Sequence, residues 1–150
     1  MSLTPHPPLP TPHFMKHNLA LTTASLLSIL LFGVHWAYEV AHGWETGGPQ
    51  GLGGVLIMVV WLYATVVLAE RRSGYIIMLI GGILGLGVLG LHMMGRGLIG
   101  GSGGRIATSS SVFFWVSTLI ALGVSGLFSA LLSVHGLLSL RRGAARADTE

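Results

Sequence analysis

Residues 112–140 read VFFWVSTLIALGVSGLFSALLSVHGLLSL and contain no Asp, Glu, Lys or Arg. A hydrocarbon core about 30 Å thick is crossed by roughly 20 apolar residues in a helix, so this run is long enough to span a bilayer. At about 1.5 Å per residue it is longer than the core requires, and the helix must therefore tilt or protrude. This run predicts an integral membrane protein.

Three more apolar runs precede it, at residues 19–38, 52–69 and 75–94. The first is longer than the apolar region of a signal peptide, roughly 7–15 residues, so we expect a retained helix. Helices satisfy their own backbone in lipid, and no run alternates with period two as barrel strands do. Because the connections are short, we expect an all-α polytopic membrane protein with an antiparallel bundle of four transmembrane helices.

The flanking segments differ in composition from these runs. Residues 1–18 carry five of the prolines and should form an extended lead with little order of its own. Met15 is an alternative to Met1 as the start of translation. Residues 141–150 form a charged tail, so the predicted membrane domain comprises residues 19–140.

Composition excludes several classes of protein. Only 9% of the residues are charged, against about 25% in a soluble domain, so a soluble chain could not cover its surface. There are no cysteines, which excludes disulfides, thiolate metal sites and thiol catalysis. The net charge is +3, but the basic residues lie beside the apolar runs and not on one soluble face, so nucleic acid is not an expected partner.

The basic residues predict the orientation of the chain, because cytoplasmic loops are enriched in Lys and Arg. Two arginines, Arg96 and Arg105, lie on one side of the predicted membrane. Six basic residues lie on the other: Lys16, Arg71, Arg72, Arg141, Arg142 and Arg146. Both termini should therefore be cytoplasmic, with the loops at 42–54 and 95–111 outside.

Small residues recur at a spacing of four in two of the runs. Gly81 and Gly85 lie in the third, and a row of Ala121, Ser125, Ser129 and Ser133 lies in the fourth. Such seams allow close helix contacts. The alternative interpretation is that the glycines leave room for a flat cofactor such as haem. Aromatic residues near the span ends, among them Trp115, are expected to anchor the helices at the interface.

One cluster of residues has the chemistry of a site. His35, Glu39 and His42 share a helical face within a 60° arc at about 100° per residue. His92 ends the third run, at the same predicted outer boundary. Ionisable groups at membrane depth face a partner or a cavity, so a hydrogen-bonded polar cluster that fixes helix register is one interpretation and a bound metal or haem is the other.

Several cofactors fit these residue types. Neutral imidazole suits zinc, copper and iron, and His35 or His42 could pair with His92 on haem b. Met93 and Met94 would add weaker thioether ligands for copper. Glu39-x-x-His42 matches half of a carboxylate di-iron motif, but the other half is absent from this chain.

Three classes of function remain. No complete catalytic set is present, so we expect a non-catalytic accessory or interaction subunit of a larger membrane complex, with lipid and either a membrane-protein partner or a second copy around it. A metal or haem protein of electron transfer or metal handling, using His35, Glu39, His42 and His92, is the alternative. A small channel or transporter ranks third, because the middle of the bundle offers only hydroxyl groups.

Three segments resemble a known group: Val60 to Tyr63, Leu68 to Tyr75, and His92 to Gly95. They are similar to the corresponding parts of small, uncharacterised bacterial four-helix membrane proteins. The resemblance would cover most of the chain beyond Met15. The resemblance implies the same fold and a multi-pass protein of the bacterial inner membrane. It implies no activity and no site.

Overall fold

The computed structural model describes residues 12–43, 48–94 and 111–147, and within these ranges every regular element is a helix. The prediction of an all-α fold is therefore confirmed. The elements are α1 (Pro12–Ala41), the short 3₁₀ helix η1 (Gly48–Gly51), α2 (Leu52–Val67), α3 (Arg72–Met93) and α4 (Ser111–Ala147).

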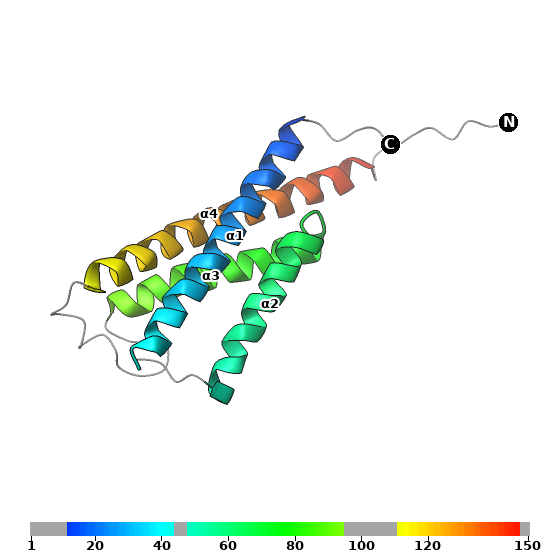
Figure 1. The fold of residues 1–150 in the computed structure, drawn as a ribbon. Helices are drawn as coiled ribbons and strands as arrows, with labels where there is room; N and C mark the ends of the chain where they lie inside the picture. The colour runs from blue at the N-terminus through cyan, green and yellow to red at the C-terminus, as the bar shows by residue number, and fades with distance from the viewer. Residues whose placement is uncertain (1–11, 44–47, 95–110, 148–150) are drawn as a thin grey trace.

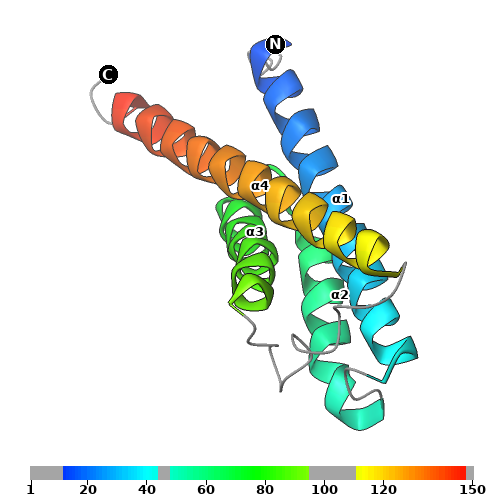
Figure 2. The ribbon, with the colours of Figure 1, turned by 90° about the vertical axis from the view of Figure 1, so that its left-hand side faces the viewer.

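Consecutive helices run in opposite directions along the bundle (Figure 1). The start of α1, the α2–α3 turn and the end of α4 lie at one end, which we call the basic end. The end of α1, the end of α3 and the start of α4 lie at the other end, which we call the histidine end. α4 packs against α3 and α1, whereas α2 lies at the edge on α1 and α3 (Figure 2).

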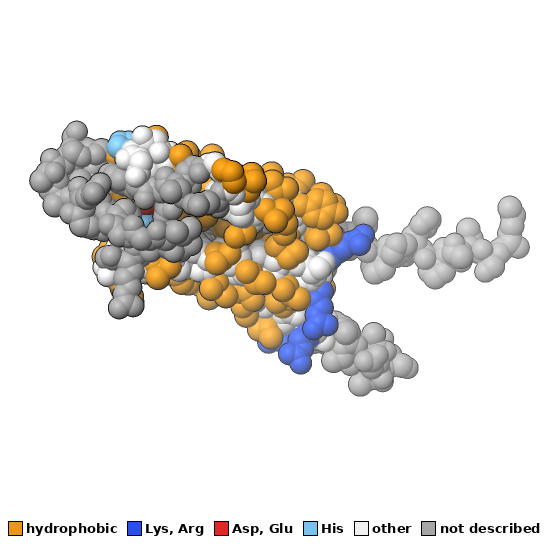
Figure 3. All heavy atoms as spheres, turned by 90° about the horizontal axis from the view of Figure 1, so that it is seen from below, with side chains coloured by type: hydrophobic (Ala, Val, Ile, Leu, Met, Phe, Trp, Pro, Cys, Tyr) orange, Lys and Arg blue, Asp and Glu red, His pale blue; other side chains and the backbone are white. Residues whose placement is uncertain are grey.

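Three of the helices, α1, α3 and α4, are long and apolar enough to cross a membrane. The fourth, α2, is apolar but only 16 residues long, or about 24 Å. Large apolar side chains face outward along the helices, with Phe113 81% and Leu30 62% exposed, and apolar atoms dominate the surface in Figure 3. Lipid accounts for such a surface, since a water-soluble monomer rarely exposes a large continuous apolar patch.

Helices α1 and α4 extend furthest beyond the predicted spans. α1 begins at Pro12, so residues 12–18 of the predicted lead are helical. Proline is favoured at the first helical position, because its missing N–H has no partner there anyway. α4 continues to Ala147 instead of ending at 140, since its tail contains alanine and arginine, which both favour helix. The remainder of the lead and most of the 95–111 loop lie outside the described residues.

Glycine residues allow the backbones of α3 and α4 to lie in close contact. A Cβ atom added to Gly82 would lie 2.6 Å from the carbonyl oxygen of Gly126, and one added to Gly126 would lie 2.7 Å from that of Gly82. In the third run, Gly81 faces Trp61 and Gly85 faces Leu122. The predicted glycine seam is therefore used within the chain for helix contacts.

A ring of hydrogen bonds fastens α2 to α1. The indole Nε1 of Trp61 donates to Ser25 Oγ at 2.8 Å, and Thr65 Oγ1 donates to the carbonyl oxygen of Trp61 at 2.8 Å. Ser25 and Thr65 are joined at 2.7 Å, and Ser25 is the donor because the proton of Thr65 is already committed. All these polar groups are buried and paired, as an apolar environment demands.

Candidate metal centre

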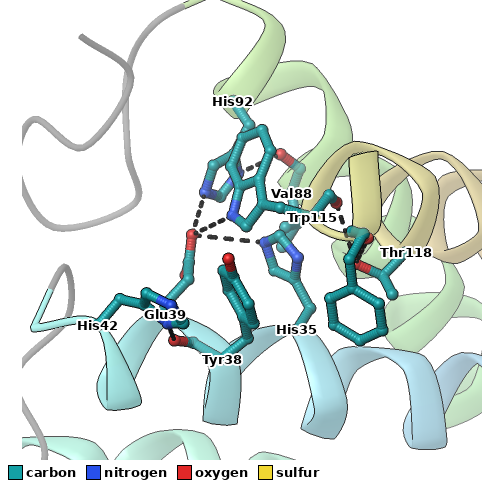
Figure 4. A network of polar contacts seen from close by, with 9 residues as sticks. His35, Tyr38, Glu39, His42, Val88, His92, Trp115 and Thr118 are labelled. Carbon is teal, nitrogen blue, oxygen red and sulfur yellow. Dashed lines mark hydrogen bonds and ion pairs between the residues drawn. The ribbon is translucent and has the colours of Figure 1, made fainter. Parts of the chain in front are cut away.

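The histidine end brings together side chains from three helices (Figure 4). His35 and Glu39 lie one turn apart near the end of α1, and His92 lies in the last turn of α3. Trp115 comes from the start of α4. The alternation of helix directions places these positions at one depth, because two of the helices end where the third begins.

Oε1 of Glu39 is the centre of the group. His92 Nε2 lies 2.9 Å from it and His35 Nε2 lies 3.4 Å from it. The indole Nε1 of Trp115 donates a hydrogen bond to the same oxygen at 3.3 Å. The side chains of His35, Glu39 and His92 are 2%, 6% and 4% exposed, so water has little access to them.

A backbone hydrogen bond holds the ring of His92. Its Nδ1 lies 2.8 Å from the carbonyl oxygen of Val88, one turn back in α3. A carbonyl oxygen only accepts, so Nδ1 carries a proton and donates it. This bond turns Nε2 toward Glu39, and it matches the bond to a carbonyl that metal-binding histidines usually make with their second nitrogen.

His35 is oriented by its surroundings in a different way. Its Nδ1 has no hydrogen-bond partner among the described residues, although the side chain is almost fully buried. The ring packs against those of His92 and Trp115, with centroids 5.2 Å and 5.4 Å away. A buried imidazole with an unsatisfied nitrogen is uncommon in folded proteins and calls for a physical explanation, such as an ion or a water.

The interior side of the group is closed by apolar side chains. Val88, Trp115, Leu119 and Leu122 form one buried cluster, with Leu31 and Phe32 packed against it. The buried hydroxyls of Ser28 and Ser125, joined at 3.0 Å, lie beyond this layer. The polar group at the histidine end is therefore separated from the hydroxyls in the middle of the bundle.

Three predicted ligands lie outside the group. The ring of His42 stacks on Tyr38 with centroids 4.0 Å apart, and its Nδ1 donates to the carbonyl oxygen of Tyr38 at 2.8 Å. Met93 and Met94 are 74% and 75% exposed. The structure thus brings together His35, Glu39 and His92, and it places His42 and the two methionines elsewhere.

Trp115 is the member that sequence reasoning missed. We expected it to anchor α4 at the membrane interface, yet it is 5% exposed and bonded to Glu39. The signal was present in the spacing, because Trp115, Leu119 and Leu122 recur every three to four residues and so line one helical face. Only the neighbouring helices reveal that this face meets a carboxylate.

The donor atoms of His35, Glu39 and His92 all lie within 4.8 Å of one another. Two ligands each about 2.1 Å from one ion lie about 3.0 Å apart at a right angle and about 3.4 Å apart at a tetrahedral angle. The two separations from Glu39 Oε1, 2.9 Å and 3.4 Å, match these values. Two ligands of one such ion can be at most about 4.2 Å apart, so the two imidazoles, in a group that spans up to 4.8 Å, would move closer together around an ion. The group can therefore offer two imidazoles and one carboxylate to a small cation.

No protein-family model, no curated protein and no solved structure matches this chain. Its function must therefore be argued from the geometry of the site. Fold alone would not decide it, because four-helix bundles host many unrelated functions.

Proposed function

We propose that this membrane protein binds one divalent transition-metal ion between α1 and α3, through His35, Glu39 and His92. The observation that carries the proposal is the convergence of two imidazole nitrogens and one carboxylate oxygen within 4.8 Å in a nearly dry site. Charged groups at membrane depth are costly, and they are retained where they serve a partner or an ion.

The bond to Val88 supports a cation at this position. Because His92 Nδ1 donates to Val88, the 2.9 Å contact between Nε2 and Glu39 Oε1 needs a cation between these two atoms, which is either a second proton on the ring or a metal ion. A single proton would join His92 to Glu39 only, whereas a metal ion would also use the nearby Nε2 of His35.

The ligand types narrow the choice of ion. Imidazole and carboxylate together suit Zn²⁺ and Fe²⁺, and two histidines with one carboxylate form the facial set of non-haem iron sites. Copper(I) favours thioethers, and the exposed Met93 and Met94 are outside the group. Glu39 occupies the space between the two imidazoles, which favours a bare ion over a haem that both would ligate.

The role of the ion follows from the three protein ligands. Three ligands leave at least one position open, which is typical of sites that exchange or react and unlike closed structural sites. The apolar layer around Leu119 and Leu122 lies on the interior side, so we infer that the ion exchanges at the histidine end. Metal handling is therefore the function we favour within this class.

Metal content of the purified protein tests the proposal. After loading with Zn²⁺ or Fe²⁺ and removal of excess metal, we expect about one ion per chain. His92→Ala should lose this ion, and His42→Ala, which removes a histidine outside the group, should retain it. Helix content by circular dichroism verifies that both variants fold. Absence of stoichiometric metal, or equal retention by the two folded variants, would overturn the proposal.

We further propose that the basic end faces the cytoplasm of a bacterial cell, with the protein in the inner membrane. Support comes from the arginines, because Arg71 and Arg72 at the α2–α3 turn and Arg141 and Arg142 in α4 share that end. The metal site would then face the outside. A role as a subunit of a larger membrane assembly stays a prediction, and it is compatible with this site, which lies at one end.

A further inference from the structure

The basic end has a groove between the start of α3 and the last turns of α4. Its volume is about 440 Å³, and its lining includes Arg72, Ile76, Val134, Leu138 and Arg141. Arg72 and Ile76 are one turn apart in α3. Val134, Leu138 and Arg141 follow at spacings of four and three in α4, so each helix presents one continuous face to the groove.

The polar and apolar parts of this groove lie at different depths. Arg72 is the first residue of α3, and Arg141 follows the apolar run of α4. Ile76 lies about 6 Å deeper than Arg72, and Val134 lies about 10 Å deeper than Arg141, at 1.5 Å per residue. The groove therefore carries two cations at its mouth and an apolar channel below them.

Neither arginine has a counter-ion among the described residues. Both are exposed, and neither forms an ion pair within the part of the chain that the structure describes. Glu70, the nearest carboxylate in sequence to Arg72, instead accepts a hydrogen bond from Asn18 Nδ2 at 3.3 Å. Two guanidinium groups are thus available for an external anion.

We propose that this groove binds one anionic phospholipid, with its phosphate between Arg72 and Arg141 and one acyl chain along Ile76, Leu138 and Val134. The occupant follows from charge complementarity, because arginine pairs well with phosphate and basic pockets between transmembrane helices bind anionic headgroups. A larger groove of about 720 Å³ between α1 and α4 has no charged residue in its lining. It can accept an acyl chain but offers no counter-ion, so it should not select lipid by charge.

The proposal is independent of the metal site, which lies at the other end of the bundle. It is tested on the full-length protein by native mass spectrometry after delipidation and titration with dioleoyl phosphatidylglycerol or dioleoyl phosphatidylcholine. We expect one phosphatidylglycerol to be retained at concentrations where phosphatidylcholine is lost. Inorganic phosphate at millimolar concentration should not displace it, because the acyl chain contributes to binding.

Two double variants separate the groove from net charge. Arg72→Gln with Arg141→Gln should weaken the retention of phosphatidylglycerol by about 30-fold, as expected for two basic groups at an anionic headgroup. Arg71→Gln with Arg142→Gln removes the same charge from exposed arginines that do not line the groove, and it should change retention less than threefold. Equal losses in the two variants, no loss in either, or equal binding of both lipids would overturn the proposal.

Discussion

At the scale of single residues, Glu39 is the side chain on which the histidine end depends. One of its oxygens lies within 3.4 Å of three nitrogen atoms, from His35, His92 and Trp115. An unpaired carboxylate in such a dry site would be costly, and the three neighbours offset that cost. The same carboxylate supplies the only negative charge that the proposed metal ion receives from the three ligands.

Exchange of this carboxylate for an amide tests its role as a ligand. Glu39→Gln keeps the shape of the side chain but removes its charge, so the affinity for Zn²⁺ should fall at least tenfold, as for the loss of a metal ligand or its close partners. Competition with a chromophoric chelator measures the change. Binding should also weaken as the pH falls, because protons compete with the ion for imidazole.

The control for this variant is Glu70→Gln, the same exchange at the opposite end of the bundle. Glu70 accepts a hydrogen bond from Asn18 and has no contact with the histidine end, so the affinity for Zn²⁺ should be unchanged. Similar losses in the two variants would contradict the assignment of Glu39 as a ligand.

Only some of the residues of the site could be predicted from the sequence, and the reasons are physical. His35 and Glu39 could be paired because a spacing of four places them on one helical face. His92 required only the alternation of helix directions. His42 also shares the face of α1, but the sequence could not show that its ring would stack on Tyr38. The contribution of Trp115 depends on how α4 is rotated, which is decided by packing against α1 and α3.

At the scale of elements, the contact between α3 and α4 depends on two facing glycines. Each backbone occupies the place where the other glycine would have a Cβ atom. Association of helices in lipid relies on such close packing, because the lipid tails are as apolar as the side chains. The sequence predicted close helix contacts at Gly81 and Gly85, but it did not identify Gly82 and Gly126 as the pair at which α3 and α4 meet.

A single methyl group tests this contact. In Gly126→Ala the new Cβ atom would lie 2.7 Å from the carbonyl oxygen of Gly82, so the helices must separate. Overpacking of this kind destabilises by about 1–3 kcal/mol, which should lower the thermal unfolding midpoint in detergent. Gly87→Ala is the control, because nothing lies within 4 Å of the new atom there. A midpoint as high in Gly126→Ala as in Gly87→Ala would contradict the packing.

At the scale of the whole molecule, the two ends of the bundle differ in chemistry. The arginines that the structure describes gather at one end, while His35, His92 and Glu39 lie at the other (Figures 3 and 4). Hydropathy predicted the helical spans, because lipid imposes one strong condition on every crossing segment. It did not predict where α1 begins or where α4 ends, since helix beyond the bilayer obeys ordinary propensity and capping.

This asymmetry predicts the orientation of the chain in the membrane, and the absence of cysteine makes it simple to test. His42→Cys places a thiol at the exposed position after α1, and Ser73→Cys places one at the exposed start of α3. Because basic residues favour the cytoplasmic side, a membrane-impermeant maleimide added to intact cells should label His42→Cys and should label Ser73→Cys only after permeabilisation. The reverse pattern would place the metal site on the cytoplasmic side. Labelling of both positions in intact cells would show that the two ends do not lie on opposite faces, and the antiparallel arrangement that unites His35, Glu39 and His92 would then need revision.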